Sequence, residues 1–466
     1  CRASTVRPGT RAVARHETGV TPGPVRSLPV TTTPSRRRPP SAADRPPTTS
    51  RLWHPFSHLR DTLASELTIV EGHGARVRDS DGNWYLDATA GLWYANVGHG
   101  QSRIATAVGE QAGRLAAYST FGDMANPAAL ALADRIAELA PMPDPMVFLT
   151  SGGSDAVDTA VKMVRRFWTL RGQPERGVVI SRDLSYHGMH GHGTALAGIA
   201  ANSAGYGRVA APGFHRVPHD DAEALRRTID EIGAAQVAAF FVEPVIGAGG
   251  VHPPPPGYLA EVAEICRRSG VLLVADEVVT GFGRTGDWFA SASYGIEPDL
   301  LLFAKGVTSG YVPLGGVIAA RRVWEAFTDD TAGVFRHGYT YSGHAVACAA
   351  AIANLRLLTE DDLLPRVTVL AGRLADRLPA LAGLPGVREV RHAGLLGAVA
   401  LDVDRDPGLP DRVVRQARAS GVLTRVINGD SLQLSPAFVL TDDQLDQIVE
   451  RLGAAITTAA QPARTG

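Results

Sequence analysis

Two lysines stand out in this 466-residue chain, because Lys162 and Lys305 are the only ones beside 44 arginines. A lysine amine can lose its proton and form an imine with an aldehyde, whereas a guanidinium effectively never deprotonates. Lys305 ends the apolar run 299–305 and precedes Gly306, which predicts a strand that opens into a loop, where α/β proteins place their chemistry. An ordinary strand-end lysine also fits this run. Lys162 lies in a helix-like stretch and is interpreted as a solvated cation.

Acids end two other apolar runs, with Glu243 closing residues 237–243 and Asp276 closing residues 271–276. A carboxylate at the end of an apolar strand is costly without a partner, and a helix N-terminus is one partner that would satisfy it. A second interpretation joins Asp276 to Lys305. An aldehyde cofactor with a basic ring nitrogen needs an acid that keeps the ring protonated and a lysine that holds the aldehyde.

Two further loops carry groups that a cofactor would use. Residues 151–154 (SGGS) follow an apolar run and precede a helix that is expected to begin near Asp155. Glycines and a helix N-terminus together present backbone amides to a phosphate, although a glycine turn with a serine N-cap has the same pattern. Tyr186 follows the run 177–181 and offers an aromatic ring for stacking on a planar cofactor.

The elements that must position these residues alternate along the chain. Apolar runs predict strands, and stretches with helical spacing predict helices between them. Continuous apolar strands joined by helices indicate a largely parallel sheet that is covered on both faces. The strands are expected at 146–150, 177–181, 237–243, 271–276, 300–305 and 316–320, and the helices at 101–117, 127–140, 155–170, 222–232, 257–269 and 345–358.

Composition limits the possible domain organisation, partners and location of the protein. Residues 1–50 are rich in Arg and Pro and are expected to be disordered. They are followed by an N-terminal segment at 51–100, a large domain at 101–350 and a small α+β domain at 351–466. The net charge of −1 gives no reason to expect nucleic acid, and no apolar run approaches the roughly 18 residues of a membrane span. Three scattered cysteines favour a reducing, cytoplasmic location.

The motifs together resemble the class III, pyridoxal-phosphate (PLP)-dependent aminotransferases of the fold-type-I superfamily. The resemblance rests on residues 272–286 (LLVADEVVTGFGRTG), 298–306 (PDLLLFAKG) and 313–317 (PLGGV), and it extends from about His54 to Leu452. It is specific because five separated motifs occur in the family's order. It implies an α/β fold with a mostly parallel, seven-stranded sheet and a smaller α+β domain. It also implies transfer of an amino group through a PLP Schiff base.

The resemblance assigns a role to each matching residue. Lys305 matches the Schiff-base lysine, Asp276 the acid on the pyridine nitrogen, and Glu243 the glutamate near the cofactor hydroxyl. The positions that match residues around the cofactor ring and its phosphate are Gly153, Ser154, Tyr186 and Val278.

Two positions near the phosphate carry further implications. Thr340 resembles the threonine that reaches the phosphate from a second subunit, which implies a homodimer or a higher homo-oligomer. Gly152 departs from the family, whose phosphate loop usually has a serine here. The missing hydroxyl predicts weaker anchoring of the phosphate rather than loss of the cofactor.

Three residues bear on the substrate. Trp93 resembles the aromatic residue that lines the pocket of ω-transaminases and β-alanine:pyruvate aminotransferases. Arg425 is similar to their mobile arginine, which pairs with the carboxylate of an amino or keto acid and swings aside for an uncharged amine. A surface arginine is the alternative. Gln433 stands where acetylornithine and ornithine enzymes place a carboxylate-binding arginine, which counts against those substrates.

Other functions remain compatible with the same motifs. Residues 53–56 (WHPF) resemble diaminopelargonate aminotransferases. The pair of Lys305 and Asp276 would also serve an aminomutase, a racemase or a decarboxylase. A non-catalytic PLP-binding protein is more distant, and a nicotinamide dehydrogenase is disfavoured because no Gly-x-Gly-x-x-Gly opens a first βαβ unit. His187, His190 and His192 lie in a glycine-spaced loop without cysteine or an obvious acid ligand, so no metal is predicted.

Overall fold

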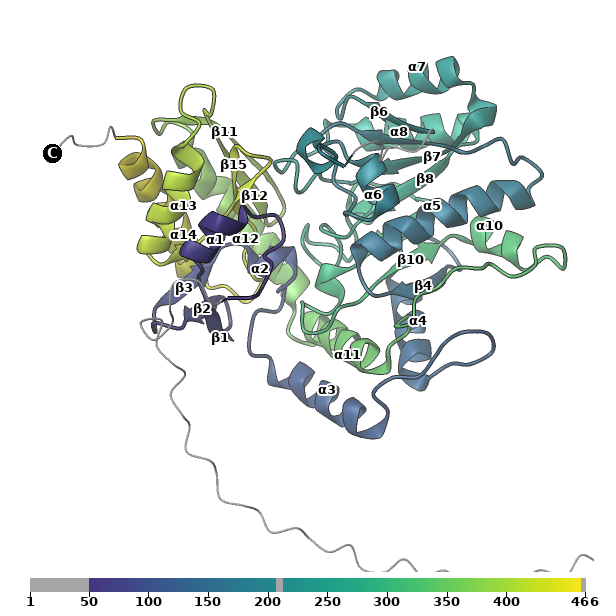
Figure 1. Cartoon of the computed structure of the whole chain (residues 1–466), viewed down its shortest axis with the longest axis horizontal. Coiled ribbons are helices and arrows are strands. Elements are labelled where there is room, and N and C mark those ends of the chain that lie inside the picture. The colour runs from purple at the N-terminus through teal and green to yellow at the C-terminus, as the bar shows by residue number, and fades with distance from the viewer. Residues whose placement is uncertain (1–49, 207–212, 462–466) are drawn as a thin grey trace, which may run out of the picture. The chain divides into compact units, whose positions relative to one another are not determined.

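A computed structural model describes residues 50–206 and 213–461 (Figure 1). The described residues form one compact unit. The disorder expected for residues 1–50 therefore lies, apart from Ser50, outside the described residues. None of the helices in the described part is long and apolar enough to cross a membrane.

A seven-stranded sheet in the order β4-β10-β9-β8-β7-β5-β6 forms the centre of the large part of this unit. All neighbouring strands are parallel except β10, which runs antiparallel to both β4 and β9. The strands are β4 (Met146–Thr150), β5 (Val178–Arg182), β6 (Phe214–Val217), β7 (Val237–Val242), β8 (Leu272–Asp276), β9 (Leu300–Phe303) and β10 (Gly315–Ala319).

Six of these strands match the predicted positions to within about two residues, because each contains a local run of apolar residues. The sequence analysis missed β6. This strand lies at the edge of the sheet, and its central residues His215 and Arg216 are exposed, so it carries no apolar run.

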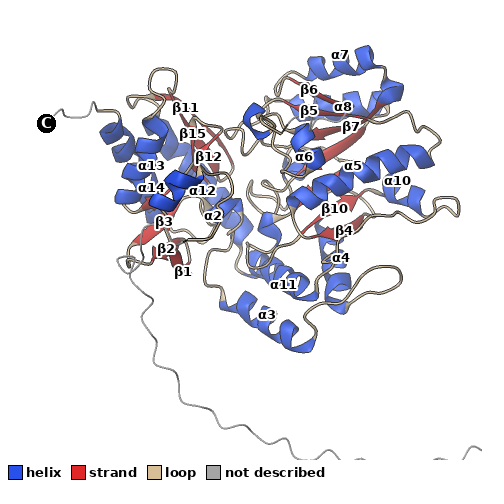
Figure 2. Cartoon of the chain, viewed as in Figure 1, coloured by secondary structure: helices blue, strands red, loops and turns tan. Residues whose placement is uncertain are grey.

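Helices cover both faces of the sheet, and Figure 2 shows the strands enclosed between them. Alternate side chains of β7 face opposite layers, with Phe241 packing in the α5 cluster and Phe240 packing against α7 and α8. The helices of this part are α3 (Ser102–Arg114), α4 (Pro127–Leu139), α5 (Gly153–Leu170), α6 (Gly191–Leu196), α7 (Ala222–Ile232), α8 (Tyr258–Ser269), α9 (Ala290–Ser293), α10 (Arg321–Trp324) and α11 (Ala345–Glu360).

The C-terminal residues form a second antiparallel sheet in the order β11-β12-β15-β14. The elements of this region are α12 (Leu363–Arg377), β11 (Val387–Ala393), β12 (Leu396–Leu401), α13 (Leu409–Ala419), β13 (Val422–Leu423), β14 (Val426–Ile427), β15 (Ser431–Leu434) and α14 (Asp442–Ala459).

The first elements of the described chain join this C-terminal region. They are α1 (Leu59–Ala64), β1 (Ile69–His73), β2 (Arg76–Asp79), β3 (Trp84–Asp87) and α2 (Ala90–Trp93). Strand β2 pairs antiparallel with β3 across the turn at Gly82. Strand β3 also pairs in parallel with β13, more than 300 residues later. Segments far apart in the sequence therefore share one sheet (Figure 1).

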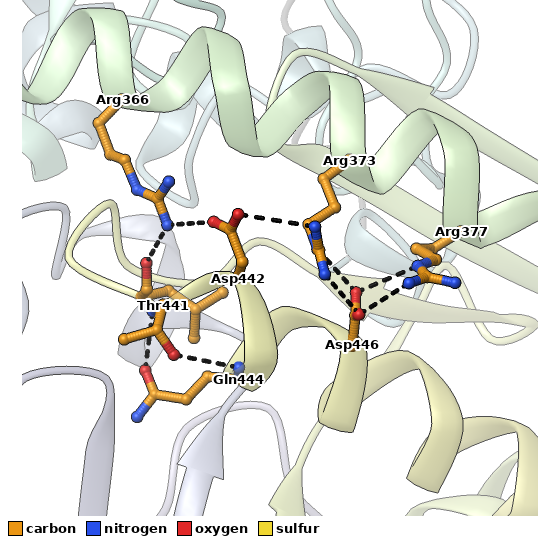
Figure 3. A network of polar contacts seen from close by, with 8 residues as sticks. Arg366, Arg373, Arg377, Thr441, Asp442, Gln444 and Asp446 are labelled. Carbon is orange, nitrogen blue, oxygen red and sulfur yellow. Dashed lines mark hydrogen bonds and ion pairs between the residues drawn. The ribbon is translucent and has the colours of Figure 1, made fainter.

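Helix α14 is tied to α12 by paired charges (Figure 3). Arg373 binds the Asp446 carboxylate through two nitrogens at 2.8 and 2.6 Å, and Arg377 approaches the same carboxylate at 2.9 Å. Thr441 caps the helix in a reciprocal arrangement with Gln444. These ion pairs hold α14 against α12.

Candidate active site

A cavity of about 390 Å³ opens where the parallel strands end. Its walls come from the loops after β4, β5, β7, β8 and β9, because the carboxyl ends of parallel strands meet at one edge of the sheet. Seven residues singled out from the sequence line this cavity, namely Gly153, Ser154, Tyr186, Glu243, Asp276, Val278 and Lys305.

Lys305 opens a short 3₁₀ turn directly after β9 and has a left-handed backbone, with φ at 42°. Asn354 stabilises this turn by donating to the carbonyls of Gly306 and Val307, each at 2.9 Å. Burial lowers the pKa of Lys305 to about 8, although the charges of Asp276 and Glu243 oppose this shift. A substantial share of the amine is therefore neutral, and nucleophilic, near neutral pH.

Asp276 ends β8, and the register of β8 on β9 pairs it with Leu302, three residues before Lys305. Its carboxylate is held by His187, whose Nδ1 lies 2.8 Å from Oδ2, and by the backbone N–H of Val278 at 3.2 Å. His187 is buried and packs edge-on against Phe241. The sequence analysis grouped His187 with a histidine cluster and missed this role; its position next to Tyr186 was the available signal.

Glu243 joins two loops at the cavity wall. Its carboxylate accepts from the backbone N–H of Tyr186 at 2.9 Å and from that of Gly247 at 3.0 Å. Complete burial raises the pKa of Glu243, while the nearby His187 opposes this shift. Glu243 thus fixes the backbone of Tyr186, whose ring lines the cavity.

The N-terminus of α5 forms a narrow seat at the cavity. The helix begins at Gly153, two residues earlier than expected. A Cβ on Gly153 would lie only 3.0 Å from a methyl carbon of Val278. The Ser154 hydroxyl oxygen accepts from the Met189 N–H at 3.2 Å. A Cβ on Gly152 would meet open space, so the absence of a side chain there is not required by packing.

These groups fit PLP, a planar, phosphorylated aldehyde with a basic ring nitrogen. The α5 seat presents backbone amides suited to a phosphate, and Gly153 keeps it free of side-chain atoms. Asp276 supplies a buried carboxylate, and Lys305 supplies an amine with a lowered pKa. Val278 and Tyr186 supply the apolar and aromatic surfaces for a flat ring.

Trp93 and Arg425 lie next to this cavity without lining it. The Lys305 Nζ is 5.8 Å from the centroid of the Trp93 ring, and the Arg425 Cζ is 4.3 Å from it. Burial lowers the pKa of Arg425 to about 10, and Tyr186 opposes this shift. Tyr94, which the sequence analysis did not select, lines the cavity, and its ring packs against Gly91 and Gly310.

The remaining candidates lie elsewhere. Thr340 is exposed in a turn and does not line the cavity of its own chain. Lys162 lies on α5 with its Nζ 2.9 Å from the His337 Nδ1. His190 and His192 each approach a different aspartate at 3.5 Å, and the described residues include no group of three or more side chains arranged to hold a metal ion.

Glu277 carries a role that the sequence analysis missed. Its buried carboxylate accepts from the hydroxyl of Thr280 and from the backbone N–H groups of Ala290 and Ser291 at 2.7 to 2.8 Å. Glu277 therefore joins the two ends of the loop 278–289, which follows Asp276. A second acid directly after Asp276, at the end of a buried strand, was the signal that could have revealed it.

Comparison with known proteins agrees with this geometry. Residues 59–456 match the model of the family described as aminotransferase class-III. The chain is 38% identical to the putrescine–pyruvate aminotransferase of Pseudomonas aeruginosa, over 82% of this chain and 88% of that one. It is 35% identical to the β-alanine–pyruvate aminotransferase of the same species, over 89% and 98%. An amine transaminase from an uncultivated Pseudomonas species in the PLP-bound form superposes with a TM-score of 0.84 at 35% identity, covering 89% and 100%.

Proposed function

This chain belongs to the class III aminotransferases and is a PLP-dependent transaminase of fold type I, and from that premise we propose its substrates, its cofactor site and its assembly. The proposed reaction moves an amino group from an amine or an ω-amino acid to pyruvate. The observation that carries it is the half-buried Arg425, a cation beside Lys305 that is suited to a carboxylate. The two relatives named above both use pyruvate according to their names, which supports the acceptor.

We assign the cofactor site to the seven lining residues. When bound, PLP supplies an electron sink that stabilises negative charge at the carbon bearing the amino group. Asp276 would hold the proton on the pyridine nitrogen, and His187 would hold Asp276 in place. Lys305 Nζ would bind the aldehyde carbon and, once released by the donor, carry the proton that leaves the donor's carbon.

Arg425 would recognise the carboxylate of the acceptor. During one cycle the site must accept a charged keto acid and, in turn, an amine that lacks a carboxylate. A long cation over the Trp93 ring, with its Cζ 4.3 Å from the ring centroid, meets both demands by moving along that surface. A charge-assisted contact of this kind contributes about 1.5–3 kcal/mol.

We further propose a homodimer in which Thr340 serves the phosphate of the second copy. Its exposure in a single chain supports this assignment. A cytoplasmic location is consistent with Cys266 and Cys348, which are free and buried thiols.

A panel of amine donors with pyruvate and 2-oxoglutarate as acceptors tests the substrate class. We expect pyruvate to be preferred, with turnover of both β-alanine and uncharged amines. Activity confined to 2-oxoglutarate, or to a diaminopelargonate-type substrate pair, would refute the amine:pyruvate assignment.

A second experiment isolates Arg425. Arg425→Ala is expected to raise the KM for pyruvate about 10- to 100-fold, in line with the loss of one charge-assisted contact. The half-reaction with an uncharged amine should stay within about twofold, because it does not use that contact. Equal losses in both half-reactions would show that Arg425 has a structural role.

A further inference from the structure

Arg425 and Gln433 form a cross-strand pair beside the active site. Strands β14 and β15 pair with Val426 opposite Leu432. One residue further along, the Gln433 N–H donates to the Arg425 carbonyl at 3.0 Å. Directly opposed residues of an antiparallel pair place their side chains on the same face of the sheet, so these two side chains are held as neighbours.

The side chains are joined by one well-aligned hydrogen bond. Arg425 Nε donates to Gln433 Oε1 at 2.6 Å, and Gln433 is fully buried. The orientation of this amide follows from its surroundings, because Nε is only a donor and must face the oxygen. The amide nitrogen then donates to the hydroxyl oxygen of Ser435 at 2.5 Å and lies 3.4 Å from the carbonyl of Thr89.

Gln433 therefore links Arg425 to the segment that carries Trp93. The Thr89 carbonyl lies four residues before Trp93, and Ser435 is joined to the same segment through its N–H on the Ala88 carbonyl. Trp93 has a left-handed backbone, with φ at 62°, which its surroundings must hold in place. The arginine and the ring on which it lies are thus positioned by one network.

The hydrogen bond also decides which edge of the guanidinium is free. With Nε bound to Gln433, only Nη1 and Nη2 remain for a ligand. Neither terminal nitrogen makes a hydrogen bond to any residue that the structure describes. A carboxylate matches two parallel N–H donors, so this free edge is suited to a bidentate pair.

We propose that Gln433 is a positioning residue that aims Arg425 at substrate carboxylates while leaving its charge intact. This inference rests on the proposed role of Arg425 in the amine:pyruvate reaction. A neutral amide is suited to this task, because a carboxylate in its place would neutralise the arginine. A single hydrogen bond from the guanidinium to a neutral amide is also weaker than a salt bridge to a carboxylate, so it can break when Arg425 moves aside for an uncharged amine.

Two variants test the proposal. Gln433→Glu keeps the shape of the side chain and adds a negative charge, and Gln433→Met keeps its length and removes the acceptor. The two donors compared are β-alanine and 3-methylbutylamine, in which two methyl groups replace the carboxylate oxygens. The half-reactions of the purified, PLP-loaded protein are followed through the absorbance of the bound cofactor.

Gln433→Glu is expected to raise the half-saturation concentrations of β-alanine and pyruvate by about tenfold or more, because it pairs with Arg425 in place of the substrate. Gln433→Met should raise them about threefold to tenfold, since Arg425 keeps its charge but loses its orientation. Values for 3-methylbutylamine should remain within about twofold in both variants, because that donor has no carboxylate to bind.

Gln111 provides a matched control. It is also buried, accepts from an arginine (Arg114) at 2.6 Å and donates to the Leu115 carbonyl at 2.8 Å, but it lies on α3 and does not line the cavity. Gln111→Met and Gln433→Met are compared by thermal unfolding. The proposal predicts that only the Gln433 variants discriminate β-alanine from its isostere, even where both variants lower the Tm.

An Arg425→Ala background separates this inference from the proposed function. If Gln433 acts through Arg425, adding the uncharged Gln433→Met there should cause no further selective loss for β-alanine. A further selective loss would mean that Gln433 contacts the carboxylate directly, and equal loss for both donors would mean a structural role; either result overturns the proposal. If Arg425→Ala alone changes the half-saturation concentrations of β-alanine and 3-methylbutylamine equally, the role of Arg425 in the proposed function is refuted.

Discussion

At the scale of single residues, burial gives Lys305 a lower pKa than a lysine has in water. The amine lies near the Trp93 ring and is buried, so its charged form is poorly solvated and its pKa falls to about 8. Asp276 and Glu243 limit this fall by favouring the charged form. The balance leaves both protonation states accessible near neutral pH, as a residue that bonds an aldehyde and then transfers a proton requires.

The lowered pKa of Lys305 predicts how the cofactor-free protein captures PLP. Only the neutral amine attacks an aldehyde, so the rate should rise about tenfold per pH unit below pH 8 and level off above it. The growth of visible absorbance after mixing measures this rate. Borohydride reduction and peptide mapping should place the adduct on Lys305. A rate that still rose near pH 10, or an adduct on Lys162, would contradict the assignment.

Asp276→Asn tests the acid on the ring nitrogen. Asparagine keeps the shape and can still bond His187, so PLP should remain bound. Turnover should fall by about 100- to 10,000-fold, because the neutral amide no longer holds the ring proton. Cofactor content by absorbance and kcat are measured together, with Asp158→Asn, on the opposite side of α5 from the core, as the control. Near-normal kcat would remove Asp276 from the mechanism.

At the scale of secondary structure, the register of the strands and the start of α5 bring the site together. Pairing of β8 with β9 places Asp276 beside the strand that leads to Lys305. The first turn of α5 lies against Val278, so the proposed phosphate seat and the residue proposed to pack on the ring are neighbours. Gly152 directly precedes α5, so substitution there can test how a side chain at this position affects PLP binding.

Gly152→Ser is expected to tighten PLP binding about threefold to tenfold, because the added hydroxyl contributes one hydrogen bond. The backbone at Gly152 is extended and a Cβ there meets open space, so no strain is introduced. Gly153→Ala is expected to weaken PLP binding, because the added Cβ would press on Val278. Equilibrium release of the cofactor measures both. Unchanged binding in Gly152→Ser would show that the phosphate does not lie at this residue.

At the scale of the whole molecule, the described chain is one compact unit, within which we propose three parts: an N-terminal segment at 51–100, a large part at 101–350 and a small part at 351–466. The pairing of β3 with β13 supports grouping the first part with the last. Exposed apolar side chains also lie in the segments next to the Thr340 turn, among them Phe121, Val334 and Tyr341. Their exposure supports a second copy as the partner of this surface.

The proposed assembly predicts that Thr340→Ala weakens PLP binding about threefold to tenfold, through loss of one hydrogen bond supplied by the second copy. Light scattering should give the mass of a dimer or a larger assembly. Mixing Thr340→Ala subunits with Lys305→Ala subunits should form hybrid dimers. In each hybrid, one of the two sites combines an intact Lys305 from one subunit with an intact Thr340 from the other. A fully active monomer at high dilution would contradict this assembly.

The sequence by itself determined the elements and the chemistry that lie in short stretches of chain. The strands before Asp276 and Lys305 were predictable because each is a local apolar run, and the residue types at their ends restricted the reaction. Membership of the family followed from the same local motifs.

Only the tertiary structure decided which side chains meet. His187 faces Asp276 across 89 residues, and the Trp93 ring lies near both Lys305 and Arg425, which are distant in the sequence. The pairing of Arg425 with Gln433 depends on the register of β14 and β15, although the turn between them, Asn428 and Gly429, is a hairpin signal that could have suggested it. Such contacts arise from strand register and packing between segments, which residue patterns within any one segment do not contain.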